Sequence, residues 1–204
     1  MEETQALLLA ELDHRIKNTL AVVQAIVRQT LRTVRTKEEA ESAVSARLRA
    51  LARAHDLLRD RQWLEAWLGD IVNSVLAANS IEPSRVRVSG PRIAMSSPQA
   101  LSIALALHEL ATNAIKHGSL STNQGRVEIK WRVEGDNDAW QFVFEWREQD
   151  GPAVAPPTHV GFGSELIERV WAADFDADVA LNYPSSGFVF TARGPWARPT
   201  PKQK

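Results

Sequence analysis

The sequence contains no cysteine, and that absence excludes two kinds of structure. With no cysteine among 204 residues, neither a disulfide framework nor a thiolate metal site is possible. Long apolar runs are also lacking, since stretches such as Ala104 to Leu107 fall far short of the roughly 20 residues that a membrane helix needs. The N-terminus, Met-Glu-Glu-Thr, has no basic start of the kind found in signal peptides. We therefore expect a soluble, cytoplasmic protein without a membrane segment.

A large excess of charge of either sign is missing as well. The chain has 24 Lys and Arg against 25 Asp and Glu, which gives a formal net charge of -1. This balance argues against a protein whose main task is to bind the phosphate backbone of a nucleic acid. The hydrophobic content of 44% is enough for one substantial core or two small ones, so we expect the chain to fold.

The N-terminal part of the chain has the period of amphipathic helices. From about Gln5 to Val34, apolar residues recur at steps of three and four: Leu12, Ile16, Leu20, Val23, Ile26 and Val27. Thr36 is a suitable N-cap, and a second apolar stripe follows it: Val44, Leu48, Leu51, His55 and Leu58. A hairpin of two such helices buries too little to be stable alone, so we expect a homodimer whose hairpins form a four-helix bundle.

The rest of the chain mixes helices and strands. Helical periodicity returns over Leu64 to Ala78, and the alternating residues Val86 to Ser89 are typical of a strand. Pro98 suits the first turn of a helix that continues through the apolar run Leu101 to Ile115. Gly118 suits a left-handed C-cap, which would end that helix.

Four β-rich runs and one more short helix complete the pattern. Arg126 to Glu134 and Trp140 to Glu148 alternate in polarity and flank the turn residues 135–138, so they should pair as a hairpin. A short helix over Ser164 to Trp171 is expected before the last strands: Asp178 to Tyr183 and Gly187 to Arg193. These elements predict an α+β sandwich with an antiparallel or mixed sheet that helices cover on one face. We place the hairpin at 1–62, this domain at 63–196 and a tail at 197–204.

His14 is the first candidate for chemistry. At about 100° per residue, it points roughly 160–200° away from the apolar stripe of the first helix, toward solvent. An imidazole with an ordinary pKa of about 6.5 can attack a γ-phosphoryl group, with nearby side chains to orient it: Asp13, Lys17 and Asn18. A surface histidine on a polar helix face explains the same residues, so the rest of the chain must decide.

A second cluster follows the helix of residues 108–118. One polar stripe contains His108 or Glu109, then Asn113, and then Lys116 or His117. The amide oxygen of Asn113 suits Mg²⁺, which prefers hard oxygen ligands and keeps waters and phosphates around it. Lys116 can contact a phosphate. A zinc-protease interpretation fails because the second histidine would have to stand at Thr112. An asparagine that only caps or fills a polar gap is the alternative.

A third cluster combines a strand end with a helix start. Glu148, in the segment 146–152, can accept a hydrogen bond from an adenine amino group. Gly151 and the run Gly161-Phe162-Gly163 permit close approach of the backbone, and the helix N-terminus at Ser164 favours a phosphate. Each of these signals alone also fits a simple turn or a solvated acid.

In their order and spacing, these clusters resemble the HWE family of two-component sensor histidine kinases. The family letters correspond to His108, Trp146 and Glu148, and the resemblance runs from about Leu8 to Gly194. It implies a dimerisation and phosphotransfer hairpin joined to a Bergerat-type (GHKL) ATP-binding domain. It also implies ATP and Mg²⁺ as cofactors and the receiver domain of a response regulator as partner.

The resemblance also assigns roles to individual residues. It implies that His14 is the phosphoacceptor, that Asn113 is the Mg²⁺ ligand and that Glu148 faces adenine. Gly161 and Gly163 would end the ATP lid, and three further residues would support the helical box: Glu109, Lys116 and His117. The chain departs from the family at Asp150, where a second glycine is favoured. No sensory module is expected, since about a dozen residues precede His14.

Three other interpretations compete with a histidine kinase. A phosphotransfer adaptor would keep the hairpin but carry a degenerate domain that does not bind ATP. A related ATPase or protein-serine kinase would share only the nucleotide domain and would not need His14. A purely structural helical bundle would leave the nucleotide-like motifs without explanation.

Overall fold

The computed structural model of the chain divides into two compact units, Met1–Arg49 and Ala50–Lys204. The residues that the structure describes are 23, 24, 27, 28, 36–38, 40–42, 44, 45, 48, 49, 52, 66–136, 139–154, 167, 168, 171, 172 and 174–196. Some predictions fall outside them: those at Asp13, His14, Asn18, Gly161, Phe162 and Gly163, the domain boundary between residues 62 and 63, and the tail 197–204.

In the first unit, the described positions agree with two helices. Positions 23, 24, 27 and 28 are helical, and helix resumes at Lys37 after a bend at Thr36. The carbonyl of Thr36 accepts the N–H of Ala40 at 3.1 Å, which is the first intrahelical bond expected of an N-cap. The predicted start of the second helix after Thr36 is therefore confirmed.

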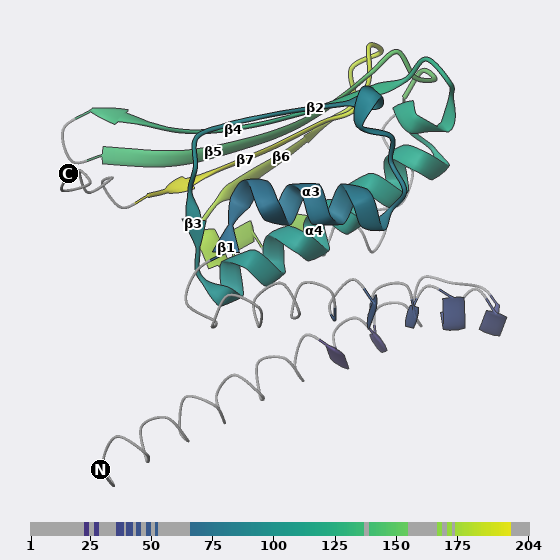
Figure 1. Ribbon diagram of the computed structural model, residues 1–204, viewed down its shortest axis with the longest axis horizontal. Helices are drawn as coiled ribbons and strands as arrows, with labels where there is room; N and C mark the ends of the chain where they lie inside the picture. The colour runs from purple at the N-terminus through teal and green to yellow at the C-terminus, as the bar shows by residue number, and fades with distance from the viewer. Residues whose placement is uncertain are drawn as a thin grey trace, which may run out of the picture. The chain divides into compact units, whose positions relative to one another are not determined.

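The second unit is built on a five-stranded sheet with the order β2-β4-β5-β7-β6 (Figure 1). Its strands are β2 Val86–Ser89, β4 Arg126–Asp136, β5 Ala139–Gln149, β6 Asp178–Asn182 and β7 Val189–Pro195. Strands β4 and β5 form the predicted hairpin, and all neighbours are antiparallel except β2, which runs parallel to β4. The prediction of a mixed sheet is confirmed.

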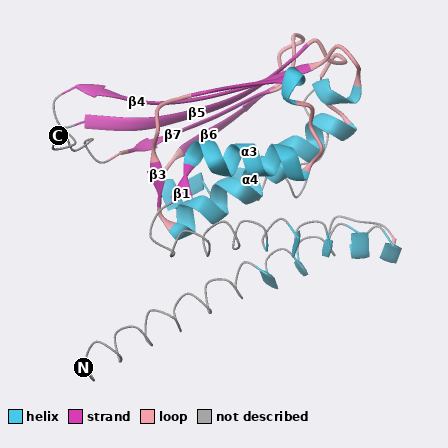
Figure 2. Ribbon diagram, viewed as in Figure 1, coloured by secondary structure: helices cyan, strands magenta, loops and turns pink. Residues whose placement is uncertain are grey.

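Helices α3 (Leu68–Ala78) and α4 (Ser97–Lys116) lie on one face of this sheet, as Figure 2 shows. The strands alternate accordingly. On β5 the inward side chains of Phe142, Phe144 and Trp146 are at most 1% exposed. The outward Arg147 and Glu145 pair on the open face, with 3.1 Å between Nη2 and Oε1. One face of the sheet is thus core, and the other carries charged side chains such as Glu145 and Arg147.

Helix α3 begins later than its periodicity predicts. The sequence suggested helix from Leu64, but Ala66–Trp67 forms a short strand, β1, that pairs with β3 (Ala94–Met95). The N–H of Leu68 also donates to the carbonyl of Ile93 at 2.9 Å. Pairing with a distant segment overrides the local helical pattern, which carries no information about that partner. The prediction of helix at positions 66 and 67 is wrong for this reason.

Helix α4 begins as predicted but does not end as predicted. Ser96 and Gln99 form a capping box, and Pro98 occupies the first turn. At the other end, Gly118 has φ -102°, which is not left-handed, so the predicted C-cap is wrong. Across the described part of the chain, no helix is both long enough and apolar enough to span a membrane.

An aromatic cluster joins the last helical segment to the sheet. Residues 167, 168, 171, 172, 174 and 175 are helical, so helix is found beyond the predicted end at Trp171. The ring of Trp171 lies 4.7 Å from that of Phe175 and 5.3 Å from that of Phe144, between centroids. Such close ring pairs contribute beyond their buried area, and they hold this segment against β5.

Candidate functional site

Glu148 lies near the end of β5, on the face of the sheet that the helices cover. The residue is only 4% exposed although it carries a carboxyl group. Two donors hold it: the backbone N–H of Ser119 donates to Oε2 at 2.6 Å, and the indole Nε1–H of Trp146 donates to Oε1 at 3.3 Å. A buried carboxylate needs such partners because an unpaired buried charge is costly. Glu148 thereby ties β5 to the segment that follows α4.

Burial raises the pKa of Glu148 above its ordinary value of 4.5. Hydrogen bonding by the Ser119 N–H and the Trp146 indole favours the ionised form and offsets this effect only in part. Perturbed carboxyl groups of this kind concentrate at functional sites, where a buried acceptor is kept for a ligand. Sequence alone indicated an acid at a strand end but not its burial.

Gly118 is required by the approach of this carboxyl group. A Cβ atom on Gly118 would stand 2.0 Å from Oε2 of Glu148 and 2.9 Å from Cα of Ala114. Neither distance is possible, so only glycine fits. Close contact between α4 and Glu148, rather than a left-handed turn, explains why glycine stands after this helix.

Two further glycines, Gly151 and Gly187, pack closely against Ser119 and Glu148. A Cβ on Gly151 would lie 2.4 Å from Cα of Ser119, so this predicted site residue does permit close backbone approach. Gly187 has φ +135°, and a Cβ there would lie 2.1 Å from the carbonyl oxygen of Glu148. The sequence had marked Gly187 only as the start of a strand. Its role depends on packing against β5, which no local pattern reveals.

The polar stripe of α4 divides into a buried and an exposed part. Asn113, Lys116 and His117 are exposed at the C-terminal end of the helix. Glu109 is only 5% exposed, although it lies one turn before Asn113 on the same side. The backbone carbonyl of Asn113 accepts the N–H of Gly118 at 3.0 Å, and the N–H of the next residue, Ser119, donates to Glu148. The structure thus brings Glu148 of β5 close to the C-terminal end of α4, which carries Asn113, Lys116 and His117.

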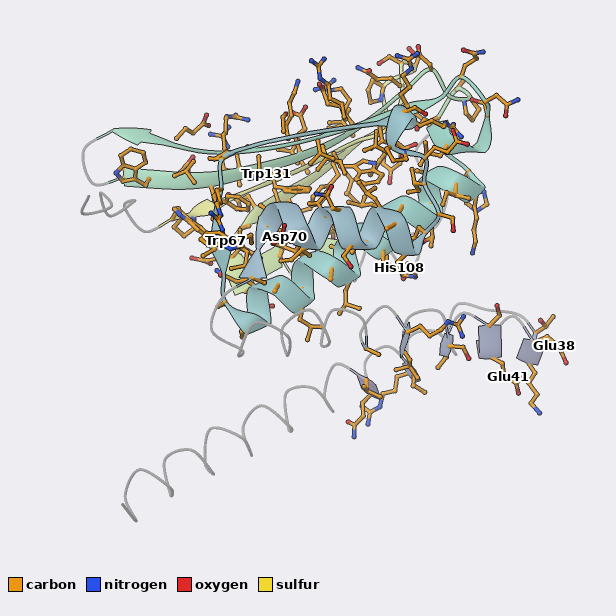
Figure 3. The ribbon with its side chains drawn as sticks, in the orientation of Figure 1. Glu38, Glu41, Trp67, Asp70, His108 and Trp131 are labelled. Carbon is orange, nitrogen blue, oxygen red and sulfur yellow. The ribbon has the colours of Figure 1, made fainter. Side chains whose placement is uncertain are left out.

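His108 is buried between the two helices rather than turned to solvent. The residue is 6% exposed, and its Nδ1 lies 3.3 Å from Nδ2 of Asn79, at the C-cap of α3. The same amide nitrogen donates to the carbonyl of Val75 at 2.8 Å, which identifies it as the NH₂ group. His108 Nδ1 must therefore accept, and this contact fastens the end of α3 to α4, where Figure 3 labels His108.

Arg85 is a residue of the site that sequence analysis missed. From η1 (Pro83–Arg85) its guanidinium donates to Gly125 O at 3.0 Å from Nε and 2.8 Å from Nη2, to Thr122 O, and to Leu120 O at 3.5 Å. These carbonyls belong to and follow η2 (Ser119–Ser121), the segment that binds Glu148. One fixed cation therefore shapes the loop beneath the site.

The backbone conformation at Asp150 is one that glycine adopts easily. It has φ +57°, in the left-handed region where a side chain is disfavoured and where Asp is among the better tolerated residues. The hydroxyl of Thr122 donates to its carbonyl at 3.4 Å. The departure from the family pattern therefore costs some backbone strain.

The described residues are compatible with a magnesium ion that has few protein ligands. Among them, no group of three or more His, Asp or Glu side chains is placed to hold a metal ion. The exposed side chain of Asn113 offers an amide oxygen at this end of α4. Mg²⁺ often takes one or two protein ligands and completes its shell with waters and phosphates, so a single asparagine is compatible with it.

A separate hollow of about 470 Å³ lies at the other end of α3 and is not part of this site. It is lined by Trp67, Gly69, Asp70, Val88, Ser89, Gly90, Pro91, Arg92 and Trp131. Figure 3 shows three of these residues, Trp67, Asp70 and Trp131, well apart from His108. Arg92 covers the ring of Trp67 at 3.9 Å, and none of the predicted site residues lines the hollow.

Sequence comparison identifies relatives of the whole chain. The family model for HWE histidine kinases matches residues 11–92. The blue-light-activated histidine kinase of Brucella ovis is 37% identical over 195 residues, which covers 95% of this chain and 40% of the relative. That of Brucella anthropi is 38% identical over the same shares. The chain thus spans about two fifths of the length of the curated relatives that it matches.

Structural comparison agrees on the fold. The blue-light activated histidine kinase of Erythrobacter litoralis EL346 superposes with a TM-score of 0.62 at 20% identity, over 92% of this chain and 58% of that chain. Its histidine kinase domain alone gives a TM-score of 0.56 at 14% identity, over 88% and 94%. The predicted α+β fold is confirmed. Residues 11–92 thus match the HWE histidine kinase family, and the relatives that align with almost the whole chain are named as histidine kinases.

Proposed function

We propose that this chain is the catalytic core of a sensor histidine kinase, which phosphorylates its own His14 with ATP and passes the phosphoryl group to an aspartate of a response regulator. The observation that carries the proposal is the arrangement at the end of α4. Glu148 is buried and held by two hydrogen bonds, one of them from Ser119, which follows the exposed end of α4. The match of residues 11–92 to the HWE histidine kinase family supports the same activity.

Different residues would contact the adenine, the phosphates and the Mg²⁺ ion. Glu148 would accept a hydrogen bond from the amino group of adenine, since its burial makes an unoccupied lone pair costly. Lys116 is exposed beside Asn113 and would neutralise phosphate charge. Asn113 would hold Mg²⁺, which lowers the negative charge on the transferred phosphoryl group. Gly151 and the lid residues Gly161, Phe162 and Gly163 would let the backbone approach the phosphates, and His117 would support this end of α4.

The reaction itself is a simple displacement. A ring nitrogen of neutral His14 forms a bond to the γ-phosphorus as the bond from that phosphorus to the β–γ bridging oxygen breaks. ADP leaves, and the imidazole loses its N–H proton to a base or to water. Asp13 and Asn18 would orient the ring, and Glu109 would support Asn113 from one turn earlier. Catalysis then rests mainly on positioning and on charge neutralisation.

Partners follow from the same proposal. The hairpin would dimerise and would also present His14 to the receiver domain of a response regulator, in the cytoplasm. The relatives are named as activated by blue light, and this chain spans about two fifths of their length. We therefore propose catalysis and phosphotransfer for this chain and assign it no stimulus.

Labelling with γ-labelled ATP and Mg²⁺ tests the proposal directly. We expect a label that is acid-labile and base-stable, as a phosphohistidine is, and that is lost in His14→Ala and in Asn113→Ala. His55→Gln serves as the control, because it removes the other imidazole of the predicted hairpin and should keep the label. ATP binding without any label on His14 would favour a related ATPase. Absence of ATP binding would favour the phosphotransfer adaptor.

A further inference from the structure

Trp146 contacts the site residue Glu148 although it is itself completely buried. It stands two residues before Glu148 on β5, so both side chains point to the covered face of the sheet. Trp146 is 0% exposed, and its indole Nε1–H donates to Oε1 of Glu148 at 3.3 Å. A ligand in the site has no access to this ring, so Trp146 can act only through Glu148.

The carboxyl group of Glu148 is constrained on both oxygens. Oε2 accepts the N–H of Ser119 at 2.6 Å. It also occupies the space that a Cβ atom on Gly118 would fill. Oε1 is held by Trp146. A carboxylate has about four acceptor positions, and these two bonds occupy two of them, one on each oxygen. The remaining positions point in fixed directions as long as both donors are present.

Removing the donor on Oε1 would release this constraint. Bound only at Oε2, the carboxylate can turn about its Cγ–Cδ bond. It would also lose one of the interactions that favour its ionised form. A hydrogen-bond acceptor that is free to turn discriminates poorly between ligands, because specificity for a donor depends on acceptors that are already in place.

We propose that Trp146 is a positioning residue that makes the site selective for a purine with a 6-amino group, by holding Oε1 of Glu148 in the orientation that accepts this group. The inference rests on the proposed function, in which Glu148 faces adenine. It assigns Trp146 a part in nucleotide specificity in addition to its place in the core.

Trp171 provides a matched control for the loss of ring size. It is 1% exposed and belongs to the same hydrophobic core, but its Nε1–H is buried without a hydrogen-bond partner in the described structure. Trp→Phe at either position removes a similar volume of buried ring. Only at Trp146 does it also remove a donor to a site residue.

The experiment compares two nucleotides on three proteins. ATP and purine riboside triphosphate, which differs by lacking the 6-amino group, are titrated against the unaltered chain, Trp146→Phe and Trp171→Phe. We expect Trp146→Phe to weaken ATP binding by about tenfold, as the loss of one charge-assisted hydrogen bond does, and to leave the analogue unchanged. Trp171→Phe should change both affinities by the same factor. Equal weakening of both nucleotides in Trp146→Phe, or no weakening of ATP, would overturn the proposal.

A second measurement needs no variant at position 146. In ¹⁵N-labelled protein the Trp146 indole resonance should shift when ATP binds and stay in place when the analogue binds. An indole signal that responds equally to both nucleotides, or to neither, counts against the positioning role even if Trp146→Phe fails to fold. The proposed function fails in a different way, since the unaltered chain would then not bind ATP at all.

Discussion

Gly118→Ala should destabilise the catalytic domain. The new Cβ would lie 2.0 Å from Oε2 of Glu148, so the carboxyl group must move away. Overpacking of this kind costs about 1–3 kcal/mol, and loss of the Ser119 hydrogen bond to a charged acceptor costs about 1.5–3 kcal/mol. A gain of about 0.4–1 kcal/mol from the unfolded state offsets part of this. We expect a net loss of about 3 kcal/mol.

Gly69→Ala is the matched control for this change. Gly69 lies in the first turn of α3, where a Cβ would meet only the ring of Trp131 at 3.9 Å, an ordinary contact. It should stabilise the domain by about 0.5 kcal/mol through helix propensity. Urea unfolding followed by tryptophan fluorescence measures both, and a net loss of about 3 kcal/mol lowers the midpoint by about 1.5 M. Equal midpoints for the two variants would refute the account of Gly118.

Three further changes test the site and the end of α3. Because burial raises the pKa of Glu148, ionisation of its carboxyl group opposes folding. The free energy of unfolding of the unaltered chain, relative to that of Glu148→Gln, should therefore fall as pH rises through the raised pKa. A difference between the two proteins that does not change with pH would contradict this. Arg85→Met should cost about 2–4 kcal/mol in chemical denaturation because buried carbonyls lose their donor, and Arg85→Lys should recover only part of the loss. Ser80→Gly should raise the melting temperature by a few degrees, since Ser80 has φ +55° after α3 and glycine adopts that conformation without steric strain; a lower melting temperature would count against this.

Local patterns predicted the parts of the fold that local physics decides. The alternation of β4 and β5 and the turn residues between them identified the hairpin, because a strand with one buried face must alternate. Pro98 in the first turn marked the start of α4. The motif residues Asn113 and Glu148 were identified by family resemblance, and the structure brings their segments together at Gly118.

The parts that were missed depend on partners far away in the sequence. The strand β1 has only two residues, too short to show any period, and its partner β3 lies almost thirty residues later. Arg85 looked like any polar residue after a proline, since its acceptors belong to the segment after α4. His108 was placed on a polar stripe, but the neighbour that buries it, Asn79, comes from α3.

The ring of carbonyl oxygens around Arg85 resembles what many enzymes build around a structural metal ion. Here the positive charge is covalently part of the chain, and a guanidinium does not deprotonate in proteins. A chelator therefore cannot remove it, and a change of pH cannot neutralise it. The segment that contacts Glu148 is therefore held without a divalent ion. Under the proposed function, removal of Mg²⁺ would stop phosphoryl transfer and leave the adenine-binding region intact.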